Sequence, residues 1–198
     1  MRKLFGAAVV AVLVSSTTVV VPALAGPQTY TVDTSHSQVL FAFNHHGFAD
    51  VVGMLGGVTG TIVFDREAPE TSTTEVRLPL SSLTTGHAER DHDILSADFL
   101  GAEASPEVVF RSTSIRVVAE NRALITGDLT LNGITKAVVL DTVLNKDAPS
   151  GKKATPTLGF SATTTLLRSD FGAGRSAPSN SDTVEVRLFL EAKAAELP

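Results

Sequence analysis

The residues best suited to chemistry in this sequence are its five histidines and two Arg-Asp tracts, because the chain contains no cysteine. His45 and His46 are adjacent, so on an extended strand their side chains point to opposite faces and do not chelate one ion together. The sequence also has no H-x-H or H-x-x-x-H pair, and we therefore expect no metal site. The other histidines, His36, His87 and His92, are expected on the surface or in turns, and Asp91 and Asp93 flank His92.

The two Arg-Asp tracts are Arg90-Asp91 and Arg168-Ser169-Asp170. Acid-base catalysis needs titrating groups beside a nucleophile in a polar cleft, and neither tract supplies that combination. The chain also lacks a G-x-S-x-G nucleophile motif and a phosphate-binding glycine loop, so we predict that it is not an enzyme. Two roles remain open for the tracts. They could form Arg-Asp pairs that close one end of a fold, or hold the polar head group of a ligand through the arginine fork.

Alternation of apolar and polar residues recurs through almost the whole chain after the first 25 residues, which predicts β-strands. Asn132-Gly133 lies between two such runs and is a strong hairpin signal, because both central residues of a type I′ turn need positive φ. This turn would place Leu129 opposite Lys136. It would also place Ile125 opposite Leu140. The eight predicted strands span residues 30–44 with a break near Ser35, 51–65, 73–80, 106–118, 122–132, 135–145, 156–168 and 182–192.

Two segments do not follow the alternation. The charged stretch 87–95 suits a short helix, with Thr85 as its candidate N-cap. In the predicted strand 106–118, strict alternation places Phe110 and Arg116 on the same face, so the pattern does not assign an inner face there.

Eight long strands leave sheet edges that closure into a barrel removes. The sequence therefore predicts an all-β fold, an eight-stranded antiparallel barrel with a short helical segment between strands 3 and 4. A two-sheet sandwich is the alternative, disfavoured by the long strands and short connections. The interior of an eight-stranded barrel is either filled by side chains or holds one small ligand, and alternation alone does not decide between them.

Residues 1–25 have the pattern of a secretory signal peptide. Arg2-Lys3 is followed by an apolar run over Leu4–Val14 and by the small-residue site Ala23-Leu24-Ala25. The polar stretch Ser15–Thr18 interrupts the run well before the roughly 20 apolar residues that a membrane span needs. We therefore predict an exported chain, secreted or periplasmic, with no membrane span after cleavage.

The remaining residues, 26–198, have the length of one domain, and no linker or repeat divides them. The whole chain has a formal net charge of −5, and loss of a basic signal peptide makes it more acidic still. Such a protein repels nucleic acids and anionic membrane surfaces, so neither is an expected partner.

Seven short motifs follow one another along this domain. They are Tyr30-x-Val32-Asp33-x-x-His36-Ser37, Val39-x-Phe41-x-Phe43-x-His45, Gly53 and Gly60 with Ile62-x-Phe64-Asp65, Arg90-Asp91 with Leu95-x-x-Asp98-Phe99, Pro106-x-x-x-Phe110-x-Ser112-Thr113, Gly127-Asp128-Leu129-Thr130-x-x-Gly133-x-Thr135-Lys136, and Arg168-Ser169-Asp170-Phe171-Gly172. In this order and spacing they resemble the YceI-like family of exported polyisoprenoid-binding proteins. The resemblance implies a lipocalin-like barrel, commonly a homodimer, whose tunnel takes a long isoprenoid or fatty chain. The departures at residues 92–93, 100–101 and 105 all lie in the helical interval.

From the alternation and the resemblance together, we predict binding of a polyisoprenoid, isoprenoid quinone or fatty-chain lipid, as a carrier or store in the bacterial envelope or medium. No cofactor is required beyond such a bound lipid. The apolar wall is expected to consist of Val39, Phe41, Phe43, Ile62, Phe64, Val76, Leu78, Leu80, Phe99, Phe110, Ile125, Leu129, Val138, Leu140, Phe160, Leu166, Val186 and Leu188. The polar end is expected to consist of Arg90, Asp91, Arg168 and Asp170. The alternative is a secreted structural or interaction barrel with a filled core, acting through surface loops such as 172–181.

Overall fold

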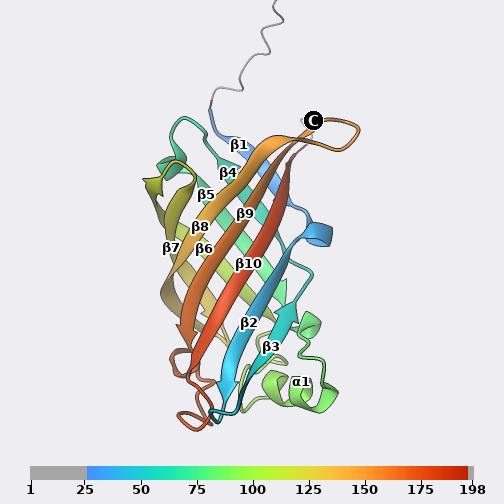
Figure 1. The fold of residues 1–198 in the computed structure, drawn as a ribbon, viewed down its shortest axis with the longest axis vertical. Coiled ribbons are helices and arrows are strands. Elements are labelled where there is room, and N and C mark those ends of the chain that lie inside the picture. Colours follow the sequence, from blue (N-terminus) through green and yellow to red (C-terminus); the bar gives the residue numbers. More distant parts are fainter. Residues whose placement is uncertain (1–25, 196–198) are drawn as a thin grey trace, which may run out of the picture.

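A computed structural model describes residues 26–195, which form one long β-barrel with a short helix at its lower end (Figure 1). The predicted signal peptide, residues 1–25, lies outside the described residues. The strands are β1 (Gln28–Val32), β2 (Gln38–His45), β3 (Ala49–Leu55), β4 (Thr59–Phe64), β5 (Thr73–Pro79), β6 (Glu107–Ala119), β7 (Arg122–Leu131), β8 (Ile134–Ser150), β9 (Thr155–Leu167) and β10 (Thr183–Ala194). The helix is α1 (Ala88–Leu95), and the 3-10 turns are η1 (Thr34–His36), η2 (Pro69–Thr71), η3 (Leu80–Ser82) and η4 (Arg168–Phe171).

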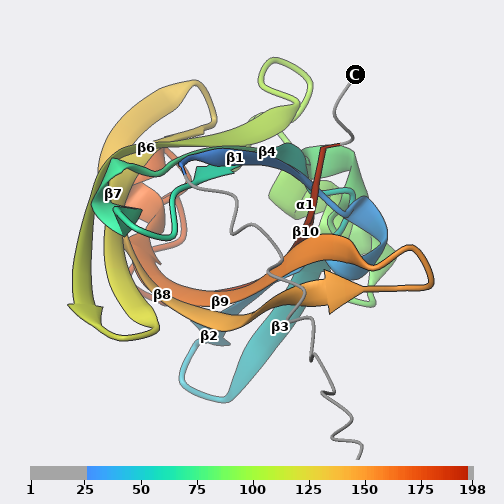
Figure 2. The same ribbon diagram turned by 90° about the horizontal axis from the view of Figure 1, so that it is seen from above.

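The barrel closes because β10 pairs with β1. Around the ring the order is β1-β4-β5-β6-β7-β8-β9-β10, with every pair antiparallel, and Figure 2 shows this ring from above. β2 and β3 continue the sheet from the other half of β10. The predicted eight-stranded antiparallel barrel with one short helix is confirmed.

Two of the eight predicted strands are each divided in two. The first is interrupted by η1 between β1 and β2, close to the predicted break at Ser35. The second is interrupted between β3 and β4, where Gly57 has a φ of 66°. A positive φ is costly for residues with a Cβ, and glycine therefore allows the chain to change direction here. The upper parts of both strands complete the ring, and the lower parts form the β2–β3 hairpin.

The hairpin register predicted around Asn132-Gly133 is confirmed. Leu129 lies opposite Lys136, and Ile125 lies opposite Leu140. Both turn residues have positive φ, 51° and 71°. The next hairpin is longer than predicted, because β8 continues past the predicted end at residue 145 to Ser150, and the chain reverses at 151–154.

A β-bulge explains why strict alternation fails in β6. The register between β6 and β7 shifts between Ser112 and Ser114, so one extra residue stands in β6. Phe110, below the bulge, is buried, whereas Arg116, above it, is exposed. The bulge thus reverses which residues face inward, and the inner position passes to Ile115 opposite Ile125.

The segment between β5 and β6 covers the lower end of the barrel beside β3 (Figure 1). The prediction that Thr85 caps α1 is wrong: the His87 side chain caps the helix and accepts a hydrogen bond from the Arg90 backbone N–H at 3.4 Å. Thr85 instead accepts a hydrogen bond from Arg90 Nε at 2.7 Å and donates its hydroxyl to Asp91. His87, two residues closer to the helix than Thr85, is therefore the N-cap.

Candidate ligand-binding site

Two cavities lie along the inside of the barrel. The first, of about 390 Å³, occupies the lower half and is bounded at its end by α1, by η4 and by the loop after η4. The second, of about 340 Å³, occupies the upper half. They meet at a waist formed by Val76, Phe110, Leu140 and Leu188, which line both cavities. We call them the lower chamber and the upper chamber.

All of the side chains predicted to form the apolar wall line the lower chamber, the upper chamber or both. Those in the lower chamber alone are Val39, Phe41, Phe43, Leu78, Leu80, Phe99, Leu129, Val138, Leu166 and Val186. Those in the upper chamber alone are Ile62, Phe64, Ile125 and Phe160, and the waist residues complete the set. That they contact a ligand stays a prediction. Sequence reasoning missed Ile115, because of the bulge, and Leu55 and Val58, because of the break at Gly57.

Two glycines let aromatic rings lie against the wall instead of across the lumen. A Cβ on Gly53 would stand 2.1 Å from Phe41 Cζ, on the neighbouring strand. A Cβ on Gly127 would stand 2.4 Å from Phe110 Cζ. Both distances are far below van der Waals contact, so each ring occupies the space that a side chain would otherwise fill. The hollow interior therefore depends on these glycines.

Arg168 is the main polar group of the lower chamber. Its guanidinium donates to the carbonyl oxygens of Ser181 at 2.9 Å, Asn180 at 3.1 Å and Ala173 at 3.4 Å, and to Ser176 Oγ at 3.3 Å. It also lies 5.7 Å from the ring centroid of Phe43. Burial lowers the pKa of this guanidinium. Arg168 thus fastens the loop after η4 to the end of the barrel.

Hydrogen-bonding capacity remains free beside Arg168. A guanidinium has five N–H donors, and the four bonds above leave one. Asn180 also lines the lower chamber, and its buried Oδ1 has no hydrogen-bond partner among the residues that the structure describes. Buried polar atoms are nearly always paired, so an orphaned acceptor beside a free donor suits a small polar group of a ligand.

The other three residues predicted at the polar end are placed differently. Arg90 lines the lower chamber but donates to Thr85, through Nε and also through Nη2 to its carbonyl at 2.9 Å. Asp91 accepts from Thr85, whose hydroxyl lowers the pKa of the carboxyl group. Asp170 is half exposed and lies 3.9 Å from Lys136 Nζ. Within residues 26–195 neither arginine forms an ion pair with the aspartate of its own tract, so of the two roles left open for the tracts, the structure does not show the Arg-Asp pair.

The hairpin turn between β7 and β8 also helps to close the lower end. Asn132 Nδ2 donates to the carbonyl oxygens of Phe99 and Phe171, both at 3.0 Å. The turn therefore anchors both the segment after α1 and η4. Phe171 is only 2% exposed and lines the lower chamber.

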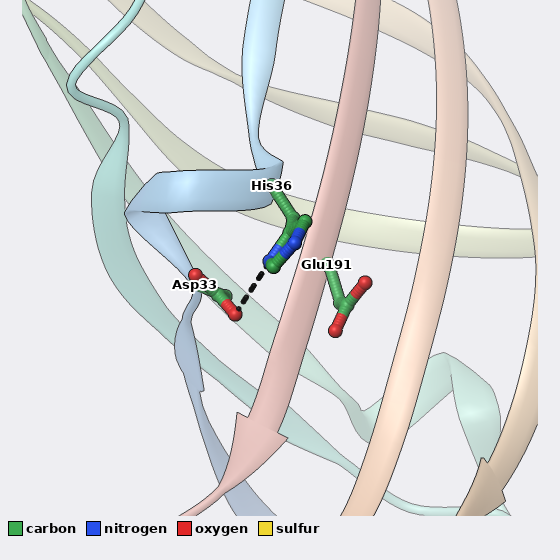
Figure 3. A group of neighbouring side chains, drawn as sticks. All are labelled: Asp33, His36 and Glu191. Carbon is green, nitrogen blue, oxygen red and sulfur yellow. Dashed lines mark hydrogen bonds and ion pairs between the residues drawn. The ribbon is translucent and has the colours of Figure 1, made fainter. Parts of the chain in front are cut away.

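Asp33, His36 and Glu191 form a group of potential metal ligands among the described residues, at the break between β1 and β2 (Figure 3). His36 Nδ1 lies 3.0 Å from Asp33 Oδ2. The ammonium of Lys193 contacts the same carboxylate and lies 3.7 Å from Glu191 Oε1. A positive charge is thus already in place, and these groups act as an ion-pair network that joins η1 to β10.

This network predicts a stability loss when Asp33 is replaced with Asn. The hydrogen bonds from Lys193, Ser35 and His36 hold the pKa of Asp33 well below its ordinary value of 3.8. Because the folded-state pKa is lowered, the contribution is complete above about pH 4 and is lost as the pH falls further. Asp33→Asn should lower the free energy of unfolding by about 1–2 kcal/mol at neutral pH. Urea unfolding followed by circular dichroism measures this.

The comparison of the two proteins at acidic pH provides the control. The difference between the native protein and Asp33→Asn should shrink as the pH falls below about 4, because Asp33 then takes up a proton in the unfolded chain before it does so in the folded protein. A difference that stays constant with pH would show that the charge of Asp33 contributes nothing.

Within residues 26–195, no helix has the length and apolar character that crossing a membrane requires. Comparisons with known proteins bear on the barrel fold and on the sequence.

Two relatives are similar over most of the chain. A UPF0312 protein from Ectopseudomonas mendocina is 40% identical over 159 residues, covering 79% of this chain and 81% of that protein. A UPF0312 protein from Pseudomonas syringae pv. syringae is 39% identical over 159 residues, covering 79% and 80%.

Solved structures share the fold. A YCEI protein from Campylobacter jejuni matches with a TM-score of 0.69 and 27% identity, over 75% of this chain and 88% of that one. BcnA from Burkholderia cenocepacia matches with a TM-score of 0.73 and 19% identity, over 81% and 98%. A polyisoprenoid binding domain from Saccharophagus degradans, implicated in plant cell wall breakdown, matches with a TM-score of 0.63 and 16% identity, over 85% and 99%.

The sequence motifs, the closed barrel and the relatives agree on one family. The family model of the YceI-like domain matches residues 30–192, nearly the whole of the described barrel. This chain therefore belongs to the YceI-like domain family.

Proposed function

We propose that this protein binds one long apolar amphiphile, a polyisoprenoid, an isoprenoid quinone or a fatty-chain lipid, inside the barrel. The observation that carries the proposal is the pair of chambers, about 390 and 340 Å³, lined by the side chains that alternate inward along the strands. The fold shared with the polyisoprenoid binding domain of Saccharophagus degradans supports this ligand class.

The energy of such binding is sufficient. Burial of one CH₂ group stabilises a complex by about 0.8 kcal/mol, so ten buried groups supply roughly 8 kcal/mol before ordering costs. Because micromolar affinity itself corresponds to about 8 kcal/mol, a ligand must bury more than ten such groups to cover the ordering costs as well, and polyprenyl and long fatty chains contain more than ten.

The polar end of the ligand would lie beside Arg168 and Asn180. The remaining N–H of Arg168 is a donor, and the buried Oδ1 of Asn180 is an acceptor. A hydroxyl group both accepts and donates, so it satisfies the two together. An alcohol or phenol head group therefore fits better than a carboxylate, which could not donate to Asn180. In this arrangement the chain runs from the lower chamber toward the waist.

In biological terms, we propose a lipid carrier or store rather than an enzyme, acting after export as a secreted or periplasmic protein without a cofactor. The homodimer implied by the family resemblance stays a prediction. The two chambers weigh against the alternative of a structural barrel whose core is filled.

Mass spectrometry tests the proposal. The protein is purified without detergent from its own host, and organic extracts are searched for co-purifying isoprenoids, quinones and fatty lipids. The stripped protein is then titrated with cis-parinaric acid, a polyene whose fluorescence rises in an apolar site. We expect a bound lipid and saturable binding. Absence of both a co-purifying lipid and polyene binding would refute the proposal.

A further inference from the structure

An ion pair crosses the mouth of the upper chamber. Arg66 follows β4, and Asp147 belongs to β8. Arg66 Nε lies 2.5 Å from Asp147 Oδ2, and Nη2 lies 2.7 Å from Oδ1. In the ring of eight strands β4 and β8 are separated by three strands on either side, so they stand on opposite walls, as Figure 2 shows. The pair thus spans the barrel instead of joining neighbouring strands.

Other contacts fix this pair in position. Arg66 Nη2 donates to Tyr30 Oη at 2.5 Å, and the guanidinium lies 5.7 Å from the ring centroids of Tyr30 and Phe64. Phe64 on β4 meets Phe160 on β9 edge to face at 6.4 Å between centroids, which is a second contact between strands that are not neighbours in the ring. The Arg66 and Asp147 side chains are 35% and 27% exposed, so the bond is partly shielded from water.

Both charged residues line the upper chamber, at the end away from α1. The remainder of that mouth is lined by η2 and by the β6–β7 turn, which contribute Pro69, Glu120 and Asn121. A chain that enters through the lower chamber and passes the waist would therefore meet Arg66–Asp147 before it reached solvent.

We propose that the Arg66–Asp147 pair is a crossbar that limits the length of the apolar chain this barrel accepts. The inference rests on the proposed function and adds its chain-length specificity. A chain that ends within the upper chamber leaves the crossbar intact. A longer chain must separate a bidentate, charge-assisted pair and place hydrocarbon beside the separated charges, which is unfavourable. Affinity should therefore rise with chain length up to a limit and fall beyond it.

The test measures affinity against chain length. Linear polyprenyl alcohols, from farnesol through geranylgeraniol and solanesol to decaprenol, compete with cis-parinaric acid for the stripped protein. Asp147→Ala and Arg66→Ala remove the crossbar, and Asp147→Asn removes its charge at nearly constant volume. Asp147→Glu retains the carboxylate. Glu75→Ala is the matched control, because Glu75 pairs with Arg111 on the adjacent strand and faces outward.

We expect the native protein, Asp147→Glu and Glu75→Ala to share one length limit. The variants that remove the crossbar or its charge should bind alcohols beyond the limit roughly tenfold more tightly, with unchanged affinity for farnesol. Circular dichroism checks that each variant is folded. If an alanine variant is unfolded, the comparison of Asp147→Asn with the native protein provides the test. The crossbar proposal is wrong if affinity depends on chain length in the same way for native protein and Asp147→Asn. It is also wrong if the affinity of the native protein does not fall beyond any chain length. Failure of the native protein to bind any alcohol or the polyene would instead refute the proposed function itself.

Discussion

Replacing Leu129 with Trp is expected to weaken binding of cis-parinaric acid at least about tenfold while changing the free energy of unfolding by less than about 1 kcal/mol. Leu129 lines the lower chamber next to the waist, and its side chain is 9% exposed. A hollow barrel accommodates the indole in space that the ligand would occupy. A filled core has no such space, and overpacking would then cost about 1–3 kcal/mol.

Leu124→Trp is the matched control, because Leu124 lies on the same strand but on the outward face, opposite Asp141. Leu124→Trp should change neither the affinity for cis-parinaric acid nor the free energy of unfolding. Fluorescence titration measures the affinity, and urea unfolding measures the stability. If Leu129→Trp destabilises the fold strongly and leaves polyene binding intact, the ligand does not occupy the lower chamber.

Replacing Arg168 with Met should lower the free energy of unfolding by about 2–4 kcal/mol. The change retains the apolar stem but removes four hydrogen bonds, three of them to backbone carbonyl oxygens of the loop after η4. The carbonyl oxygens of Ala173, Asn180 and Ser181 would then lose their hydrogen bonds from the guanidinium. Limited proteolysis should then cleave the loop faster.

Arg175→Met is the control for this second change. Arg175 lies in the same loop, pairs with Asp98 and has a side chain that is 64% exposed, and exposed pairs contribute little. Its unfolding curve should overlay that of the native protein. An Arg168→Met protein as stable as Arg175→Met would show that the loop does not depend on the guanidinium.

The strand pattern was predictable because it follows from the two-residue repeat of an extended chain. That repeat placed Leu129, Ile125 and Leu140 on the inner face, and the two-residue turn at Asn132-Gly133 gave the register of the β7–β8 hairpin. It could not locate the bulge in β6, because inserting one residue leaves both flanking alternations intact and changes only their phase. The continuation of β8 through Pro149 was missed because proline usually marks a turn.

The polar contacts were less predictable than the wall. Arg168 stands out in the sequence, but its acceptors are mainly backbone carbonyls, which leave no trace in residue identity. Arg66 and Asp147 lie 81 positions apart and meet only because the ring closes. Asp33 and Lys193 likewise come together across the β1–β10 pairing that completes the barrel.

The lower part of the wall is joined differently from the rest. Within residues 26–195 the outer edge of β3 pairs with no strand, and only Met54 and Thr84 exchange backbone hydrogen bonds there, at 2.8 and 2.9 Å. Elsewhere in the ring each strand is paired with both of its neighbours over several residues. The base of the barrel beside α1 is therefore held together mainly by the burial of side chains such as Leu55, Leu80 and Leu83, and only slightly by strand pairing.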